Sequence, residues 1–116
     1  MYDFKLNKNE EIKLISDDTL VYGREAILKV TCIITNQRLL FLDYPGAIHN
    51  SAEDLRISGR MTYIRKKEII GEMNLRNIVN ISKENTNFKI ETENGNYTII
   101  KDKKVIKFLN SFLKLN

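Results

Sequence analysis

Tryptophan is absent from this chain of 116 residues, proline and cysteine each occur once, and no long apolar run is present. The single cysteine, Cys32, cannot form a disulfide within the chain, so nothing points to an oxidising compartment. The longest uninterrupted apolar stretch, 39–42, falls far short of the roughly 20 residues of a membrane-spanning helix. The first residues also lack the apolar core of a secretory signal. We therefore expect a cytoplasmic protein, and any membrane contact would be peripheral, at the inner face.

Residues that carry catalytic or metal-binding chemistry are also sparse. The one histidine, His49, has no second histidine or cysteine at metal-ligand spacing. The glycines are isolated from one another, so the chain has no glycine-rich phosphate loop. The adjacent acidic pairs at 10–11 and 17–18 would point to opposite faces of a strand and so form no catalytic pair. We expect no enzymatic activity, no cofactor and no metal site.

The size and composition favour one domain over residues 1–116. A chain of this length buries one compact core, and 42% hydrophobic with 29% charged residues is ordinary for a globular protein. Cys32 lies within an apolar stretch, and we interpret it as a small buried side chain and not as a reactive thiol.

The positive charge is concentrated in one segment. The chain carries a net charge of +4, and residues 55–67 contribute +5, which leaves −1 for the rest. The basic residues of this segment are Arg56, Arg60, Arg65, Lys66 and Lys67. They form a candidate patch for lipid headgroups, nucleic acid or an acidic peptide. The alternative, which we favour, is a solvated edge strand whose lysines block pairing with other sheets. Nucleic acid is disfavoured because Tyr63 is the only aromatic residue in the segment.

Alternation of apolar and polar residues predicts seven strands separated by turn residues. The expected bounds are 12–22, 28–34, 38–44, 61–70, 75–82, 88–92 and 97–101, with a short helix as the alternative at 75–82. Asp17 and Asp18 interrupt the first strand and predict a bulge. Asn94 and Gly95 predict a hairpin with a type I′ turn. The strand at 38–44 is apolar on both faces, so it is either covered on both sides or lies against another subunit.

An amphipathic helix is expected over 103–115, after an N-cap at Asp102. Its apolar side chains recur at helical spacing: Val105, Ile106, Phe108, Leu109, Phe112 and Leu113. Seven antiparallel strands followed by one helix predict a curled, half-open sheet whose end the helix plugs.

The stretch 30–42, VTCIITNQRLLFL, resembles the strand-turn-strand signature of bacterial pleckstrin-homology-like and GRAM-like domains, in which L-T-x-x-R-L-x-F recurs. The matching residues are Ile34, Thr35, Arg38, Leu39 and Phe41. The resemblance extends to the opening at 9–12, the segment 69–78, the hairpin at 94–95 and the final helix. It implies a split barrel of about seven antiparallel strands in two near-orthogonal sheets, capped by a C-terminal amphipathic helix.

The resemblance also implies a binding module and not a catalyst. Members of the family bind phosphoinositides, other anionic lipids, peptides or proteins, and some are similar to ring-forming oligomers. Their lipid-binding residues lie on the first two strands and the connecting loop. The matching region here, 17–29, holds three acidic residues and only Arg24 and Lys29 as basic ones, so no lipid-binding residue is transferred from the family.

These observations together lead us to expect a non-catalytic module that binds a protein partner or itself. The candidate interface residues are Leu40, Leu42 and Tyr44. The strand at 38–44 and the helix face together present more apolar surface than one small core can bury, and surplus apolar surface marks a subunit interface. The first alternative is peripheral binding to anionic lipid headgroups through 56–67. The second is a small-molecule carrier with a calycin-like barrel, which the filled aliphatic strands disfavour.

Overall fold

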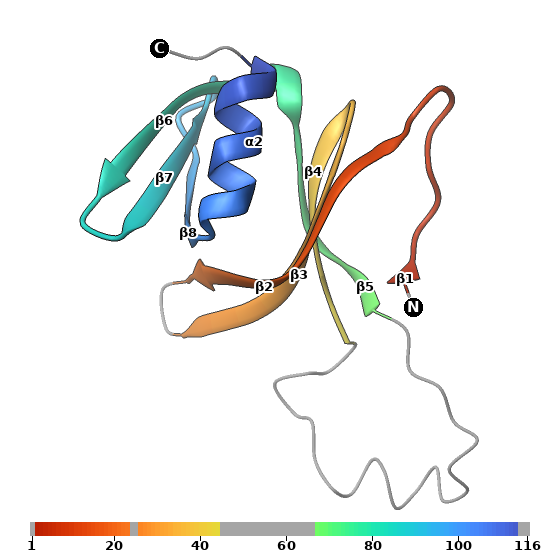
Figure 1. Ribbon diagram of the computed structural model, residues 1–116, viewed down its shortest axis with the longest axis horizontal. Coiled ribbons are helices and arrows are strands. Elements are labelled where there is room, and N and C mark those ends of the chain that lie inside the picture. Colours follow the sequence, from red (N-terminus) through yellow and green to blue (C-terminus); the bar gives the residue numbers. More distant parts are fainter. Residues whose placement is uncertain (1, 24–25, 45–66, 114–116) are drawn as a thin grey trace, which may run out of the picture.

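The computed structural model describes residues 2–23, 26–44 and 67–113, and in these ranges the chain is mainly β (Figure 1). A 3₁₀ turn, η2 (Leu75–Asn77), joins two of the strands, and one α-helix, α2 (Lys103–Leu113), ends the described chain. The strands are β1 (Tyr2–Asp3), β2 (Ile12–Tyr22), β3 (Ile27–Thr35), β4 (Arg38–Asp43), β5 (Lys67–Asn74), β6 (Ile78–Glu84), β7 (Asn87–Thr92) and β8 (Tyr97–Lys101).

The described strands form one sheet in the order β1-β5-β4-β3-β2-β8-β7-β6. The seven strands β2 to β8 pair antiparallel, as the sequence predicts, whereas the two-residue β1 pairs parallel to β5. In the described residues, β1 and β6 lie at opposite ends of this order and do not pair with each other, so the sheet is not closed.

The predicted bulge in the first strand is confirmed. The register of β2 against β3 shifts between Ser16 and Thr19, at the pair Asp17 and Asp18. Acidic side chains at a bulge point to solvent while the strand continues on either side, which explains why the strand is not broken there.

Three other predicted features differ in detail from the structure. β5 runs on to Asn74, four residues beyond the predicted end at Ile70, while the predicted residues 61–66 lie outside the described ranges. The segment predicted as a strand or short helix at 75–82 is both: η2 comes first and β6 follows. The β7–β8 hairpin is confirmed, but its turn is not type I′. A type I′ turn needs a positive φ at both central residues, and of Asn94 and Gly95 only Gly95 has one, of 88°.

One face of the curled sheet holds the main core. Its buried apolar side chains come from the strands β3, β4, β6, β7 and β8, from η2 and from α2: Val30, Cys32, Ile34, Leu39, Phe41, Leu75, Ile78, Ile90, Ile100, Val105, Ile106 and Leu109. The interpretation of Cys32 as a small buried side chain is confirmed, and burial raises the pKa of its thiol above the ordinary value.

The helix lies between the β6–β8 strands and the rest of the sheet (Figure 1). Asp102 caps its start, because one carboxylate oxygen accepts hydrogen bonds from the backbone N–H groups of Lys104 (3.0 Å) and Val105 (3.2 Å). The other oxygen accepts bonds from the hydroxyls of Ser16 (2.5 Å) and Thr19 (2.6 Å), which flank the bulge of β2. The cap therefore also fixes the helix to the sheet.

The predicted apolar stripe of the helix is only partly buried. Val105, Ile106 and Leu109 enter the core, whereas Phe112 stays 42% exposed and stacks on Phe108 with ring centroids 5.6 Å apart. The plug is therefore made mainly by the aliphatic residues of the first two turns, and the partly buried Phe108 and Leu113 pack against the same core.

A second, smaller apolar cluster lies on the opposite face of the sheet. Ile33, Leu40 and Leu42 are fully buried there, and Tyr2, Phe4 and Ile69 pack against them. The strand at 38–44 was expected either to be covered on both sides or to lie against another subunit. The structure shows that residues of the same chain cover both of its faces. Within the described residues, no helix combines the length and apolarity needed to cross a bilayer.

Candidate functional site

The turn at 35–37, within the strand-turn-strand stretch 30–42, is closed by the side chain of Thr35. The hydroxyl of Thr35 accepts hydrogen bonds from the backbone N–H groups of Gln37 (3.0 Å) and Arg38 (2.9 Å), and donates to Glu10 (2.6 Å). A threonine suits this position because its β-branched side chain fits a strand and its hydroxyl satisfies the loop backbone.

Arg38 pairs with Glu10 through two contacts. Its Nε lies 2.8 Å from one carboxylate oxygen, and its Nη2 lies 3.1 Å from the other. The same Nη2 donates to the backbone carbonyl of Lys5 at 2.8 Å. The side chains of Arg38 and Glu10 are 9% and 0% exposed, so the charges compensate each other away from water.

The pair is charged because its hydrogen bonds outweigh burial. Burial alone would raise the pKa of Glu10, but hydrogen bonds from Arg38, Thr35 and the N–H of Asn7 lower that pKa to about 2. The hydrogen bond to Glu10 is the main cause that raises the pKa of Arg38. Glu10 and Arg38 therefore act as structural ions that hold the N-terminal segment on the sheet.

The two residues at the tip of the turn bind the same segment. Asn36 exchanges two hydrogen bonds with the backbone of Glu11 and donates to the carbonyl of Asn9 at 3.0 Å. Gln37 donates to the carbonyl of Lys8 at 2.9 Å. The turn residues of the signature thus position residues 5–11, and we assign them to folding and not to ligand contact.

Of the predicted basic patch, only Lys67 falls within the described residues. Its amino group donates to the hydroxyl of Thr31 at 2.7 Å, lies 4.0 Å from a carboxylate oxygen of Asp17, and lies 5.4 Å from the centre of the Tyr44 ring. The structure thus brings together Lys67 and Tyr44, which the sequence assigned to different candidate sites. Arg56, Arg60, Arg65, Lys66 and His49 lie outside the described ranges.

The candidate interface residues do not share one surface. Leu40 and Leu42 are fully buried beneath Tyr2 and Phe4, whereas Tyr44 is exposed just past the end of β4. The two leucines therefore offer no surface to another molecule while the N-terminal segment covers them. Their role in an interface stays a prediction.

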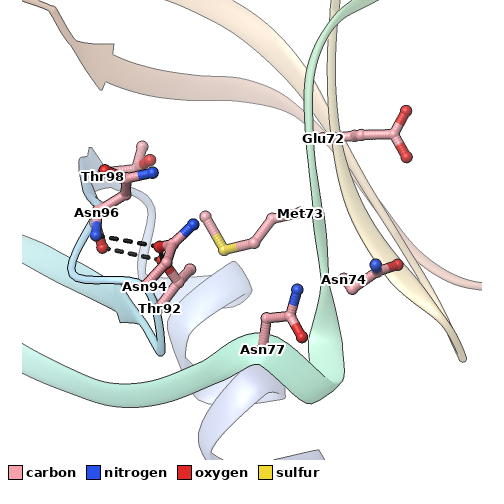
Figure 2. Close-up of a pocket in the computed structure, with 8 residues that line it drawn as sticks. All are labelled: Glu72, Met73, Asn74, Asn77, Thr92, Asn94, Asn96 and Thr98. Atoms are coloured by element: carbon pink, nitrogen blue, oxygen red, sulfur yellow. Dashed lines mark hydrogen bonds between the residues drawn. The ribbon is translucent and has the colours of Figure 1, made fainter.

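A polar cavity of about 350 Å³ lies between β5 and the β7–β8 turn (Figure 2). Met73 points into it from β5 and Asn77 points into it from η2, while Glu72 and Asn74 turn to the other side of the strand. The lining residues are Glu72, Met73, Asn74, Asn77, Thr92, Asn94, Asn96 and Thr98. The far wall is the β7–β8 turn, in which the side-chain oxygen of Asn94 accepts hydrogen bonds from the Thr92 hydroxyl (2.6 Å) and the Asn96 N–H (3.2 Å).

A second cavity, of about 280 Å³, adjoins the first and is mainly apolar. It is lined by Val21, Leu28, Phe41, Ile70, Gly71, Glu72, Met73 and Thr98, so the two share Glu72, Met73 and Thr98. Four consecutive residues of β5 line it, although consecutive strand residues point to opposite faces. The cavity therefore follows the edge of β5, and we call the two cavities together the edge groove.

The described lining of the edge groove holds one ionisable side chain. It is Glu72, whose carboxylate lies 3.4 Å from the guanidinium of Arg38. Across the part of the chain that the structure describes, no three metal-ligating side chains gather in one place.

Comparison with known proteins adds no function to this geometry. No protein-family model matches the chain, and no curated protein matches it.

The edge groove is absent from the features that the sequence predicted. Its residues come from β2, β3, β4, β5, η2 and the β7–β8 hairpin, so no local motif marks it. The available signal was the departure from alternation at Ile70 and Gly71, where the register of β5 against β4 shifts. Such an irregularity indicates a bulge, and bulges are common beside binding sites.

Proposed function

We propose that this chain is a non-catalytic binding module of the pleckstrin-homology-like kind, and that it recognises polypeptide, either in a partner protein or in a second copy. The observation that carries the proposal is the open outer edge of β5. β5 pairs with β4 from Glu68 to Asn74, but with β1 only at Lys67 and Glu68. Among the described residues, nothing pairs with the outer edge over 69–74.

An open strand edge favours a polypeptide as the ligand. Alternate N–H and C=O groups of an edge strand point outward and can pair with another extended chain. The sheet ends in two such edges, and each bears an exposed apolar side chain, Ile70 on β5 (51% exposed) and Val79 on β6 (53% exposed). Main-chain bonds give such a complex affinity, and neighbouring pockets select its side chains.

The arrangement of the strands supports the pleckstrin-homology-like assignment. The sheet has two parts, β2–β5 and β6–β8, and among the described residues their strands pair with each other only where Leu20–Tyr22 meets Ile99–Lys101. The terminal helix packs against the core between these parts. A split barrel with a helical plug would have this short junction. The resemblance of residues 34–41 to the pleckstrin-homology-like signature supports the same assignment.

The lipid alternative rests on residues of which only Lys67 is described, and its amino group already bonds to Thr31. Lipid binding through 56–67 therefore remains a prediction, which pelleting with anionic vesicles at low and high salt tests.

The proposal is tested with a defined peptide library and the intact chain. We expect display selection to enrich extended sequences that bind saturably, or light scattering to show self-association that grows with concentration. If selection enriches no sequence and the chain scatters as a monomer throughout, the polypeptide-binding proposal is wrong.

A further inference from the structure

We infer that the edge groove binds one extended peptide segment, in which apolar residues alternate with basic or uncharged ones, as an added strand on β5. This inference rests on the proposed function, and it names the site and the chemistry of the ligand. It assigns the backbone edge at 69–74, the apolar cavity and the polar cavity to three parts of one ligand.

The backbone edge of β5 already accepts a strand within the chain. β1 pairs there with Lys67 and Glu68, and its pairing stops at Asp3. An added strand over 69–74 would continue the line of β1 without displacing it. The occupant is therefore a segment in the extended conformation, since the same edge holds the chain's own extended N-terminal residues.

The apolar cavity would select a side chain of the added strand. Val21, Leu28 and Phe41 form its floor on the core side. Gly71 contributes no side chain, and a Cβ built there would meet a ring carbon of Phe41 at 3.5 Å. The space beside the strand is thus left to the ligand. Its volume of about 280 Å³ lies just below the range of about 300–1,000 Å³ of typical small-molecule sites, which favours one inserted side chain.

The polar cavity would satisfy the backbone of the same segment. Asn77, Asn96 and Thr98 line it with uncharged groups that both donate and accept hydrogen bonds. The amide nitrogen of Asn94 is also left to donate, because its oxygen is used within the turn. Peptide N–H and C=O groups need this mixture of partners.

The charge along β5 disfavours acidic segments. Glu68 and Glu72 lie on β5 with exposed side chains; Glu72 turns away from the polar cavity and lies 3.4 Å from the guanidinium of Arg38. No basic residue is among the described residues that line either cavity. An acidic peptide would meet like charge at Glu68, and at Glu72 a charge that Arg38 partly compensates, whereas lysine or arginine at alternate positions would be attracted.

The test uses the full chain, labelled with ¹⁵N, and two synthetic probes, the acetylated and amidated peptides KVKIKVK and EVEIEVE. We expect KVKIKVK to shift the amide signals of 69–74 and to bind at least about tenfold more tightly than EVEIEVE. Methylation of alternate backbone nitrogens of KVKIKVK should abolish the binding, because one edge of the added strand then loses its donors.

Two variants locate the peptide. Ile70→Asn and Val79→Asn change similarly exposed residues on the two open edges without adding charge, so each should keep the wild-type melting temperature. We expect Ile70→Asn to weaken binding of KVKIKVK at least about tenfold and Val79→Asn to leave it unchanged.

Several results would overturn the inference. If only Val79→Asn weakens binding, the peptide pairs with β6, and the proposed function stands without this site. Equal affinity for both peptides, or binding that survives backbone methylation, would reject an added strand on an acidic edge. An apolar dye that fills the cavity and is not displaced by KVKIKVK would indicate a small-molecule site. If no peptide binds and the chain is monomeric, both proposals fail.

Discussion

Arg38 and Glu10 are separated by 28 positions in the sequence and form a two-contact ion pair that is almost completely withdrawn from water. The pair links the first residue after the signature turn to the end of the N-terminal segment. Removing one partner of the pair should lower the stability strongly, because an unpaired buried charge is far more costly than a buried pair.

Replacing Arg38 alone should therefore be severely destabilising. We expect Arg38→Met to lower the free energy of unfolding by about 3–5 kcal/mol, since it leaves the Glu10 carboxylate buried without a counter-ion. Urea denaturation followed by circular dichroism measures the loss. The double variant Glu10→Leu with Arg38→Met should recover most of it. If the double variant is as unstable as the single one, the stabilising contacts of Arg38 lie elsewhere.

The low pKa of Glu10 makes stability depend on pH. Its carboxyl titrates at about 2 in the folded chain, compared with the ordinary 4.5. Because the folded-state pKa is depressed, this contribution is complete above pH 4.5 and is lost as the pH falls from 4.5 toward 2. The difference corresponds to roughly 3 kcal/mol.

Denaturation curves between pH 2 and pH 7 measure this effect. Glu10→Gln should be less stable than wild type at pH 7, and the difference should shrink steadily below pH 4.5. Glu11→Gln is the matched control, because the neighbouring side chain is exposed and should change the curve little. A constant difference between wild type and Glu10→Gln at every pH would contradict the assignment.

Asp102 should contribute more than an ordinary helix cap. Asp102→Ala removes the cap of α2, at about 1 kcal/mol, and also leaves the buried hydroxyls of Ser16 and Thr19 without an acceptor, at about 1–3 kcal/mol. We therefore expect a loss of about 2–4 kcal/mol in chemical denaturation. Asp102→Asn keeps an oxygen for the cap, so its stability should lie between those of the wild type and Asp102→Ala. A loss for Asp102→Ala below about 1 kcal/mol would mean that the bonds to β2 add nothing.

The N-terminal segment should act as a cover for the second apolar cluster. Phe4→Ala removes part of the packing over Leu40 and Leu42. We expect stronger fluorescence of a dye that binds apolar surfaces, and a loss of about 1–2 kcal/mol in stability. Leu6→Ala, which changes an exposed residue of the same segment, is the control and should have neither effect. Equal behaviour of the two variants would show that Phe4 does not cover the leucines.

The two ends of the helix should differ sharply in their contribution. Leu109 is fully buried, so Leu109→Ala should cost about 2–5 kcal/mol. Phe112 is exposed and contacts Phe108, so Phe112→Ala should cost less than about 1 kcal/mol. Thermal unfolding monitored by circular dichroism compares them. Similar losses would mean that the exposed end of the helix is also part of the plug.

The features that the sequence predicted well are those set by local pattern. Alternation from Leu28 to Ile34 depends on the two-residue period of a strand, and it reproduced β3 to within one residue at each end. Asp102 before a helical stripe was recognisable because an N-cap needs only its own side chain and the next turn. The mainly β fold with a terminal helix followed from these local signals.

The features that were missed depend on contacts between distant segments. β1 has two residues, too few for any periodicity, and exists because Tyr2 and Asp3 meet β5. The burial of Leu40 and Leu42 depends on Phe4, which no pattern within β4 can reveal. Lys67 looked like part of a free basic patch, because its partner Thr31 lies 36 positions away. The edge groove has the same origin, since its walls are assembled only when β5 and β8 face each other.

The position of Cys32 has a practical consequence for all of these measurements. Because this one thiol is completely enclosed and its pKa is raised, thiol reagents can modify it only after the molecule opens. The rate of labelling of the unaltered chain thus reports the opening equilibrium in native buffer. Every variant discussed above therefore carries its own internal stability probe, and none needs an added fluorophore or a denaturant.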